Sequence, residues 1–422
     1  MNSQRPVSLP ANASLENLRK RAKTLVKEHA AGDAAARERV ASVLPRLAEP
    51  LALHDAQLVV AREHGIASWP KLVQQLDARP PERRVLREGG RVWLDGVPRL
   101  RWGASAEPTY VGALEAAFRG SERPLDLLEL MGDSGLCFRV RWGVRMQGQA
   151  WCGSGPCGEW PEEVAALNAA TGYVFEWNDP EIAPADTRER VRTNLDRGYP
   201  ILAMPLQMDL GVILGYEGDG STLLVADYWA SEFPARVAIT DMLQVGCFLD
   251  RVQAPAPRPR AVRAGLGLAV TRFREGVVDP DPITGASYYY GSAGFERWAA
   301  DLESAPQLSA EQRQNLFHVS SWTFSGFHQG RSKHAAAYLH RAAPHFGASG
   351  SAHVLEAAGL YDQVRERLGS WDTSDPLFGM VKQKPLSSWT DDVRRREIEL
   401  LRDVCELEQR AMAALERALH GG

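Results

Sequence analysis

Two proline-rich stretches place the strongest constraint on how this chain of 422 residues can fold. The first, "DARPPERR", begins at Asp77 and holds two adjacent prolines, and the second, "QAPAPRPRAVR", begins at Gln253 and has a proline at every second position. Adjacent prolines cannot continue a helix, and alternating prolines favour an extended spacer. The two linkers therefore divide the chain into three predicted segments, residues 1–80, 85–252 and 261–422.

The first segment has the apolar spacing of a small helical bundle. In "SLENLRKRAKTLVKEHAAGD", Leu15, Leu18, Ala22, Leu25 and Val26 recur at helical intervals. Three further helices are predicted in "AAARERVASVL", "HDAQLVVAREHG" and "SWPKLVQQL". The stretch "DAQLVVAREHGIASWPKLV" resembles the N-terminal helical module of many bacterial ankyrin-repeat proteins. That resemblance implies a docking site for a protein partner, and a helical cap without a partner is the alternative.

The middle segment alternates predicted helices and strands, so the expected fold class is α+β. Helices are predicted in "TYVGALEAAFRG" and "EEVAALNAATG", and strands in "LCFRVRW", "PILAMPLQ" and "ARVAI". "RVWLDGVPRLRW" predicts a hairpin that turns at Asp95 and Gly96. "GYEGDGSTLLVADYW" predicts a second hairpin, because Gly218 and Gly220 bracket Asp219 between two apolar runs. The third segment is predicted to be almost entirely helical.

Composition excludes several functional classes. The net charge is −4 and no block of the chain is strongly basic, so nucleic-acid binding is not expected. No apolar run approaches the roughly 18 residues that a membrane span needs, and the N-terminal stretch lacks the pattern of a signal peptide. Five cysteines are few and odd in number, which fits a reducing cytoplasm better than a secreted disulfide scaffold.

The loop "QAWCGSGPCGEW" holds two cysteines on a backbone rich in glycine and proline. Cys152 and Cys157 lie five residues apart with no second pair nearby, so a zinc site is not expected. A cysteine nucleophile needs a neighbouring base, and no histidine occurs between His64 and His318. The base would have to come from the third segment, for example from His318 or His328. Otherwise the loop is expected to form the rim of a cleft, with structural cysteines.

Phosphate-binding and serine-nucleophile motifs are missing from the chain. "GDSGLC" around Ser134 lacks the G-x-S-x-G spacing of a nucleophile elbow. "GLGLAV" lacks the third glycine and the preceding strand of a dinucleotide fingerprint. We therefore expect no cofactor and no metal.

Acidic and aromatic side chains cluster at the predicted strand ends and in the cysteine loop. Asp209 precedes the strand "LGVILGY", and Asp227 ends the strand that follows it. Such residues commonly line a pocket for a small ligand, although each could instead be a core or turn residue. The predicted ligand-binding residues are Tyr110, Trp151, Glu159, Asp209, Asp227 and Trp229.

Three motifs of the middle segment, "TYVGALEAAF", "MGDSGLCFRVRW" and "LGVILGYEGDGSTLLVADYW", carry a resemblance to a known family. They resemble the peptidase C39-like family, of papain-like fold, in the form of the N-terminal domain of the butirosin biosynthesis protein BtrH. Active members place a cysteine at the start of the first helix, a histidine before the "GY" strand and Asp or Asn on the next strand. Here Thr109 or Tyr110 stands at the first position, Asp209 or Leu210 at the second, and only Asp227 matches the third.

The resemblance therefore implies a degenerate papain-like domain that binds a small molecule or a peptide in the former substrate cleft, without catalysis. An acyltransferase or amide hydrolase is the alternative, with Cys152 or Cys157 as nucleophile. Thr109 could replace the cysteine only if burial raised the pKa of Asp209 enough to make it a base. A protein-interaction module that uses the first segment is the third possibility.

Overall fold

The computed structural model describes residues 15–47, 50–77, 84–102, 108–143, 161–177, 184–207, 209–278, 287–370, 372, 374–378 and 384–421. The chain divides into two compact units. One comprises Met1–Glu82 and Val252–Pro255, and the other comprises Arg83–Arg251 and Ala256–Gly422. Helices and an antiparallel sheet together give the α+β class that the sequence predicts. No helix in the described ranges is long and apolar enough to cross a membrane.

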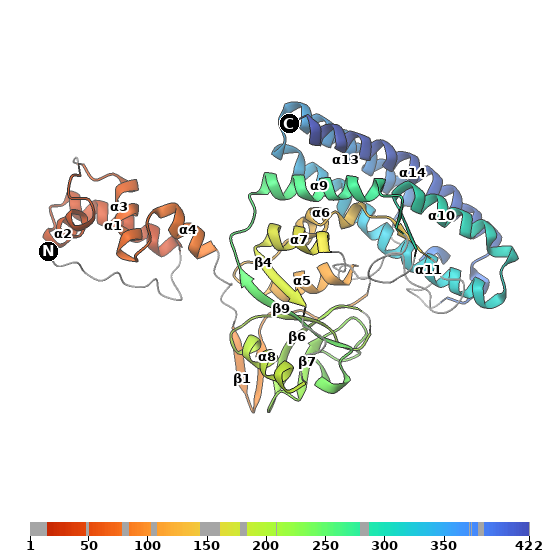
Figure 1. Cartoon of the computed structure of the whole chain (residues 1–422), viewed down its shortest axis with the longest axis horizontal. Helices are drawn as coiled ribbons and strands as arrows, with labels where there is room; N and C mark the ends of the chain where they lie inside the picture. The colour runs from red at the N-terminus through yellow and green to blue at the C-terminus, as the bar shows by residue number, and fades with distance from the viewer. Residues whose placement is uncertain are drawn as a thin grey trace. The chain divides into compact units, whose positions relative to one another are not determined.

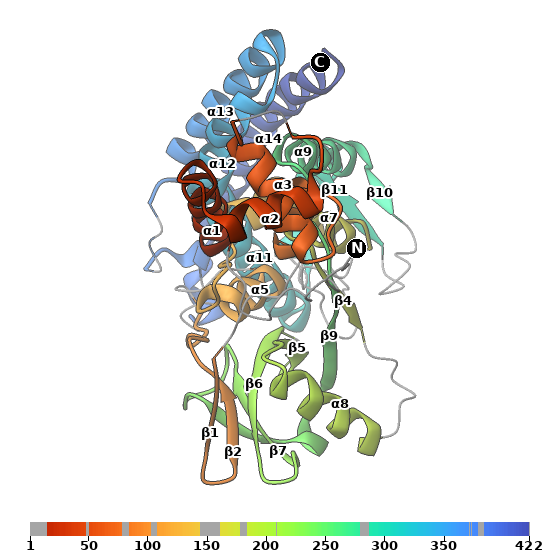
Figure 2. The same ribbon diagram turned by 90° about the vertical axis from the view of Figure 1, so that its left-hand side faces the viewer.

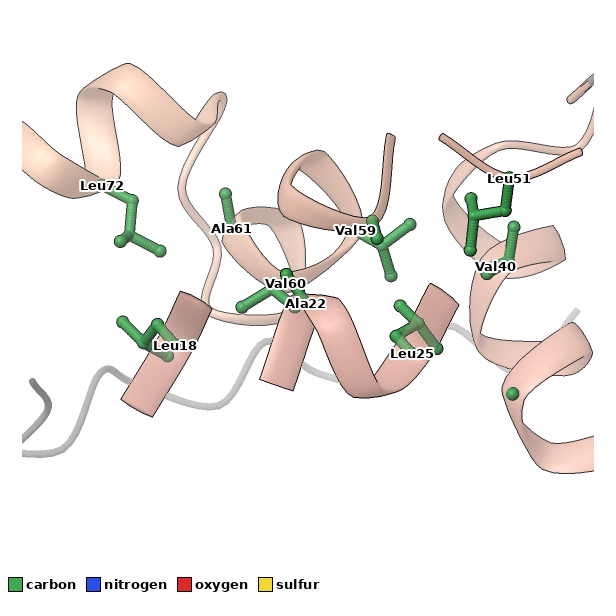
Figure 3. Packing of buried hydrophobic residues seen from close by; sticks show 11 residues of the cluster. Leu18, Ala22, Leu25, Val40, Leu51, Val59, Val60, Ala61 and Leu72 are labelled. Atoms are coloured by element: carbon green, nitrogen blue, oxygen red, sulfur yellow. The ribbon is translucent and has the colours of Figure 1, made fainter. Parts of the chain in front are cut away.

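The first unit contains the four predicted helices. They are α1 (Leu15–Ala30), α2 (Ala34–Val43), α3 (Leu53–Glu63) and α4 (Trp69–Asp77). Their apolar faces meet in one core, where Leu18, Ala22 and Leu25 of α1 are buried together with side chains of the other three helices (Figure 3). Asp33 caps α2, because its Oδ1 accepts a hydrogen bond of 2.8 Å from the Ala36 amide.

The second unit is built on a large antiparallel sheet. Its strands are β1 (Val85–Glu88), β2 (Arg91–Leu94), β4 (Tyr173–Trp177), β5 (Ile201–Met204), β6 (Gly211–Glu217), β7 (Thr222–Ala226), β8 (Ala235–Ala238) and β9 (Gln244–Val252). β6 is the central strand and pairs with β2, β5 and β7. The β1–β2 and β6–β7 hairpins extend side by side to one end of the sheet (Figure 2). A small second sheet joins β3 (Arg141–Trp142), β10 (Val277–Val278) and β11 (Tyr288–Tyr290).

One predicted hairpin is confirmed and the other turns elsewhere. Gly218 and Gly220 have positive φ angles of 59° and 89° at the turn between β6 and β7. The first hairpin turns at Gly89 and Gly90, not at Asp95 and Gly96, so that prediction was wrong. Both Gly89 and Gly90 have positive φ, which a tight turn between twisted strands requires.

The stretch "LCFRVRW" was predicted as a strand, and that prediction was largely wrong. Leu136–Phe138 forms a short 3-10 helix, and only Arg141–Trp142 pairs in a sheet. All three residues of the 3-10 helix are buried. A strand with one solvated face would bury only every second residue, so the apparent alternation is not a strand pattern here.

Ten helices of the second unit lie in the described ranges. They are α5 (Thr109–Arg119), α6 (Leu127–Asp133), α7 (Pro161–Thr171), α8 (Pro184–Asp196), α9 (Arg258–Arg274), α10 (Gly291–Ser304), α11 (Ala310–Gln329), α12 (Ala336–Ala342), α13 (Ala348–Leu368) and α14 (Asp391–His420). A π-helical segment, Gly330–Ala335, joins α11 to α12. Figure 1 shows α13 and α14 side by side, with α5, α6 and α7 between the C-terminal helices and the sheet. The short 3-10 helices are Leu136–Phe138, Ile239–Asp241, Ala305–Gln307, Ala343–His345, Pro376–Phe378 and Leu386–Ser388.

The second proline-rich stretch is extended only in part. α9 begins at Arg258, so the arginine-rich half of "QAPAPRPRAVR" is helical and not a spacer as predicted. Pro259 falls in the first turn of α9. The amide hydrogens of a first turn have no acceptor within the helix, so proline loses no hydrogen bond there, and its fixed φ angle is already helical. The last proline of the alternating pattern therefore belongs to the first turn of a helix.

A buried ion pair joins the C-terminal helices to the rest of the second unit. The guanidinium of Arg331, in the π-helical segment, bonds the carboxylate of Glu408 on α14 at 2.7 and 2.9 Å. The same guanidinium donates to the main-chain oxygens of Phe138 and Arg139, each at 2.8 Å. Arg331 thereby fixes the end of α11 against the segment that follows α6.

Candidate functional site

The two predicted acidic residues lie at the same edge of the large sheet. Val212 of β6 pairs with Ala226 of β7, so Asp209, just before β6, and Asp227, just after β7, come together. Gly211 makes this approach possible, because a Cβ there would lie 2.4 Å from the main-chain oxygen of Ala226. The negative charge of Asp227 raises the pKa of Asp209, which places the two carboxylates within electrostatic reach of each other.

Thr109 connects this edge to the start of α5. Its side chain is 4% exposed, and its Oγ1 accepts a hydrogen bond of 3.2 Å from the Leu210 amide. The same hydroxyl donates to Oδ1 of Asp209 across 3.5 Å. The next residue, Tyr110, is fully buried close to Cys247 of β9, and this burial raises the pKa of its hydroxyl. The structure therefore brings Thr109 to the acidic pair and places Tyr110 in the core.

The two carboxylate oxygens of Asp227 differ in their hydrogen bonds within the described residues. Its Oδ1 accepts the amides of Trp229 at 2.7 Å and Ala230 at 3.1 Å, which forms a tight turn after β7. Its Oδ2 is buried and has no hydrogen-bond partner within the described residues, and the whole residue is only 3% exposed. A buried carboxylate oxygen without a donor is energetically costly, and such groups are uncommon in folded proteins.

Burial raises the pKa of both carboxyl groups. For Asp209 burial is the largest cause, the charge of Asp227 adds to it, and hydrogen bonds from Trp229 and Thr109 oppose it. For Asp227 burial again dominates, and the surrounding backbone amides oppose it. Both groups therefore hold a proton to a higher pH than an exposed aspartate does.

Four aromatic rings form a cluster that Trp229 connects to the acidic pair. The ring centroid of Trp102 lies 4.7 Å from that of Tyr228, 5.6 Å from that of Trp229 and 4.8 Å from that of Trp322. Trp229 stacks on Trp322 at 6.4 Å and donates its indole hydrogen to Oδ2 of Asp209 at 2.8 Å. The indole nitrogen of Trp102 is buried and has no acceptor among the residues that the structure describes.

Sequence reasoning missed two of these rings. Trp102 stands at the end of a stretch predicted as a hairpin, and Trp322 lies in the third segment, which was predicted only to be helical. Trp322 belongs to α11, far along the chain from β6 and β7, and no sequence spacing links it to Asp209. We call Trp102, Thr109, Asp209, Asp227, Trp229 and Trp322 the strand-end site.

Arg99 holds the turn that carries Trp229. One guanidinium nitrogen donates to the main-chain oxygens of Ala230 at 3.0 Å and Ser231 at 2.6 Å. Asp227 accepts the amides of the same turn from the other side. The position of the Trp229 side chain is therefore fixed by contacts on both sides of its own backbone.

The residues predicted in the cysteine loop, Cys152, Cys157, Trp151 and Glu159, lie outside the described residues. The three cysteines that are described, Cys137, Cys247 and Cys405, are buried, and burial raises the pKa of each thiol. These thiols are therefore protonated at neutral pH and are not activated nucleophiles.

The two histidines considered as bases lie on one helix in different surroundings. His318 of α11 is exposed, and His328 of α11 is fully buried beside Phe324 and Phe378. Nδ1 of His328 lies 3.1 Å from the hydroxyl of Ser332. No group of three or more potential metal ligands occurs in the part of the chain that is described.

Three surface grooves of the described structure lie away from the strand-end site. The largest, of about 490 Å³, runs between α9 and the end of α14 and is lined by Val270, Arg274, Glu416 and neighbouring residues. Arg274 and Glu416 already pair with each other there. The other two are lined by Phe273, Tyr290 and Glu296, and by Arg91, Glu217 and Arg236, among others.

No protein-family model matches the chain, and no curated protein matches its sequence at a significant level. A function for this chain is therefore inferred from the residues of the strand-end site and from the sequence motifs.

Proposed function

We propose that the chain is a degenerate papain-like protein of the C39-like type that binds a small molecule or a peptide at the strand-end site without catalysis. The observation that carries the proposal is the convergence of Asp209, Asp227 and the aromatic rings at one sheet edge. The unpartnered Oδ2 of Asp227 supports it, because a bound ligand would supply the missing donor. The proposed setting is the cytoplasm, in line with the few cysteines of the chain.

The position of the site also fits the resemblance. In an active papain-type enzyme of this family, the nucleophile would stand at the start of α5 and the histidine just before β6. Thr109 and Asp209 occupy these places, and Asp227 follows β7. A site that keeps the placement but has lost the thiol and the imidazole is suited to binding more than to turnover.

A thermal-shift screen of small molecules and short peptides tests the proposal. A compound that binds only the folded state stabilises the protein by about 2.7 kcal/mol when its concentration is about 100 times its Kd. We expect hits on the wild-type protein that vanish in Trp229→Ala and persist in Leu355→Ala. The two side chains are matched, since Trp229 is 47% exposed and Leu355, on α13, is 45% exposed. A screen without hits, or hits that Trp229→Ala retains, would contradict the proposal.

A second candidate function is acyl transfer with Thr109 as the nucleophile. The hydroxyl lies 3.5 Å from Oδ1 of Asp209, whose pKa burial raises, so this carboxylate could act as a base if the contact shortens when substrate binds. In this reaction the Thr109 oxygen would form a bond to the acyl carbon while its proton passes to Asp209. The bond between the acyl carbon and the leaving group would then break, the leaving group would keep the electron pair, and Asp209 would return the proton to it.

Activated esters distinguish the two functions. Under the second function, p-nitrophenyl acetate should acetylate the protein, and mass spectrometry should locate the added acetyl group on Thr109. Thr109→Ser should keep this reaction and Thr109→Val should abolish it. The absence of acetylation at Thr109 in the wild-type protein would leave binding as the function of the site.

A further inference from the structure

The strand-end site carries two carboxylates, and among the described residues no cation pairs with either of them. Neither Asp209 nor Asp227 forms an ion pair with a residue of the described ranges. Arg99 lies against the same turn, but its Nη2 donates to the main-chain oxygens of Ala230 and Ser231 and not to either carboxylate. Since buried charges in proteins are normally paired, the negative charge of this site calls for a positive partner from outside the described chain.

The hydrogen bonds within the site show which atom the partner would meet. Oδ1 of Asp227 is occupied by two amides, and both oxygens of Asp209 are occupied by Thr109 and Trp229. Oδ2 of Asp227, a residue that is only 3% exposed, is buried and forms no hydrogen bond within the described residues, although the Leu206 amide is close enough to lower the pKa of this carboxyl. A ligand that satisfies this oxygen has to bring a hydrogen-bond donor, and a primary ammonium group carries three.

Apolar surface lies directly beside the carboxylates. Trp229 is 47% exposed, and its indole ring is tied to Asp209 by a hydrogen bond. Leu206 is 38% exposed, and its backbone amide lies close enough to Asp227 to oppose the rise in the pKa of that carboxyl. Indole faces attract cations as well as apolar groups, so the rings of Trp102 and Trp229 suit the part of a ligand next to its ammonium group.

We propose that the strand-end site recognises a primary ammonium group attached to an apolar body, with the ammonium on Oδ2 of Asp227 and the body against Trp229 and Leu206. The inference rests on the proposed binding function and names its ligand class. A quaternary ammonium fits less well, because it has charge but no hydrogen to donate. A free amine and a lysine side chain in a peptide share this chemistry.

Four probes of equal chain length test the inference on the full-length protein. They are hexylammonium, 1-hexanol, hexanoate and hexyltrimethylammonium, which share an alkyl body and differ in the charge, hydrogen-bonding capacity and size of the head group. The readout is the set of indole N–H signals in nitrogen-15 NMR spectra, in which Trp229→Phe and Trp102→Phe assign the site signals. Trp69, in the first unit, serves as the internal reference. An acetylated apolar peptide with one lysine, compared with hexylammonium, distinguishes the two sources of the amine.

Hexylammonium should shift the signals of Trp102 and Trp229 and bind about tenfold more tightly than hexanol or the trimethylated probe, as a charged hydrogen bond predicts. Asp227→Asn and Asp209→Asn should each weaken it by about tenfold, because they preserve side-chain shape and remove charge. Asp219→Asn, at the exposed β6–β7 turn, should leave it unchanged. If either Asp227→Asn or Asp209→Asn fails to fold, the other variant still tests whether the charge of the site binds hexylammonium.

Two results overturn the inference. One is equal binding of hexanol, hexanoate or hexyltrimethylammonium at the site, and the other is an absence of any shift of Trp102 and Trp229 with hexylammonium. The proposed binding function stands in either case if compounds of the thermal-shift screen still lose their effect in Trp229→Ala. It fails separately if no compound of any charge binds there.

Discussion

The indole nitrogen of Trp229 lies 2.8 Å from Oδ2 of Asp209, so an exposed ring after β7 donates to a carboxylate that precedes β6. The bond crosses the edge of the sheet and adds a side-chain link where the backbone pairing of the two strands has ended. It also opposes the effect of burial and of the Asp227 charge on the pKa of Asp209. Trp229 therefore acts on the electrostatics of the site as well as on its apolar surface.

Removal of this hydrogen bond should raise the pKa of Asp209 further. In Trp229→Phe the aromatic ring remains and the donor is lost, so the charged carboxylate loses a stabilising partner. We expect the pKa to rise, because the hydrogen bond from Trp229 is one of the two contacts that lower it. Carboxyl carbon-13 NMR titration measures it, and Phe233→Leu in the same loop is the control. An unchanged or lower pKa would show that the bond has no electrostatic role.

The buried pair of Arg331 and Glu408 should be more sensitive to the loss of one partner than of both. Glu408→Gln leaves a buried guanidinium without its counter-charge, and Arg331→Met leaves a buried carboxylate, so each should lower the free energy of unfolding by about 3–5 kcal/mol. The double variant Arg331→Met with Glu408→Gln should lose less than the sum of the two single losses, because no unpaired charge then remains buried. Denaturant unfolding measures all three. Additive effects of the two changes would contradict a coupled pair.

Glu397 should make the stability of the protein fall as the pH rises. Burial raises its pKa to about 7, although Ser320 and Trp389 donate hydrogen bonds to its carboxylate at 2.5 and 3.2 Å. The folded state therefore binds a proton more tightly than the unfolded state, in which the pKa is about 4.3. This contribution is complete below about pH 4.3 and is lost as the pH rises through 7, which amounts to about 4 kcal/mol.

Glu397→Gln isolates that contribution. The difference in unfolding free energy between the wild-type protein and Glu397→Gln should shift in favour of the variant between pH 5 and pH 8. Glu399→Gln, which changes an exposed carboxylate on the same helix, should follow the wild-type profile. A constant difference between the wild-type protein and Glu397→Gln across this range would show that Glu397 does not titrate there.

Gly211 should tolerate no side chain, since the Cβ of Gly211→Ala would lie 2.4 Å from the oxygen of Ala226. The strands would have to separate at the acidic pair, so we expect a loss of stability of about 1–3 kcal/mol. Gly359→Ala is the matched control, because a Cβ there meets nothing within 4 Å and the position is inside α13. The control should gain up to about 1 kcal/mol. Thermal unfolding of both variants measures the contrast, which equal stability would refute.

The sequence by itself determined the elements whose signals are local. Apolar residues at helical intervals gave the four helices of the first unit, and the glycines on either side of Asp219 gave the β6–β7 hairpin, because neighbouring residues decide both features. The same hairpin brought Asp209 and Asp227 together, since antiparallel pairing fixes which residues meet at a strand end.

Only the tertiary structure decided what surrounds that pair. Trp322, on α11, contacts Trp229, whose indole bonds the pair. The Arg331 side chain holds the end of α11 in place through hydrogen bonds to the main-chain oxygens of Phe138 and Arg139. The stretch Leu136–Phe138 forms a 3-10 helix in place of a predicted strand, and the packing that buries all three of its residues comes from elsewhere in the chain. Burial also raised the pKa of Asp209, Asp227 and Glu397, and the desolvation that causes this depends on residues distant in sequence.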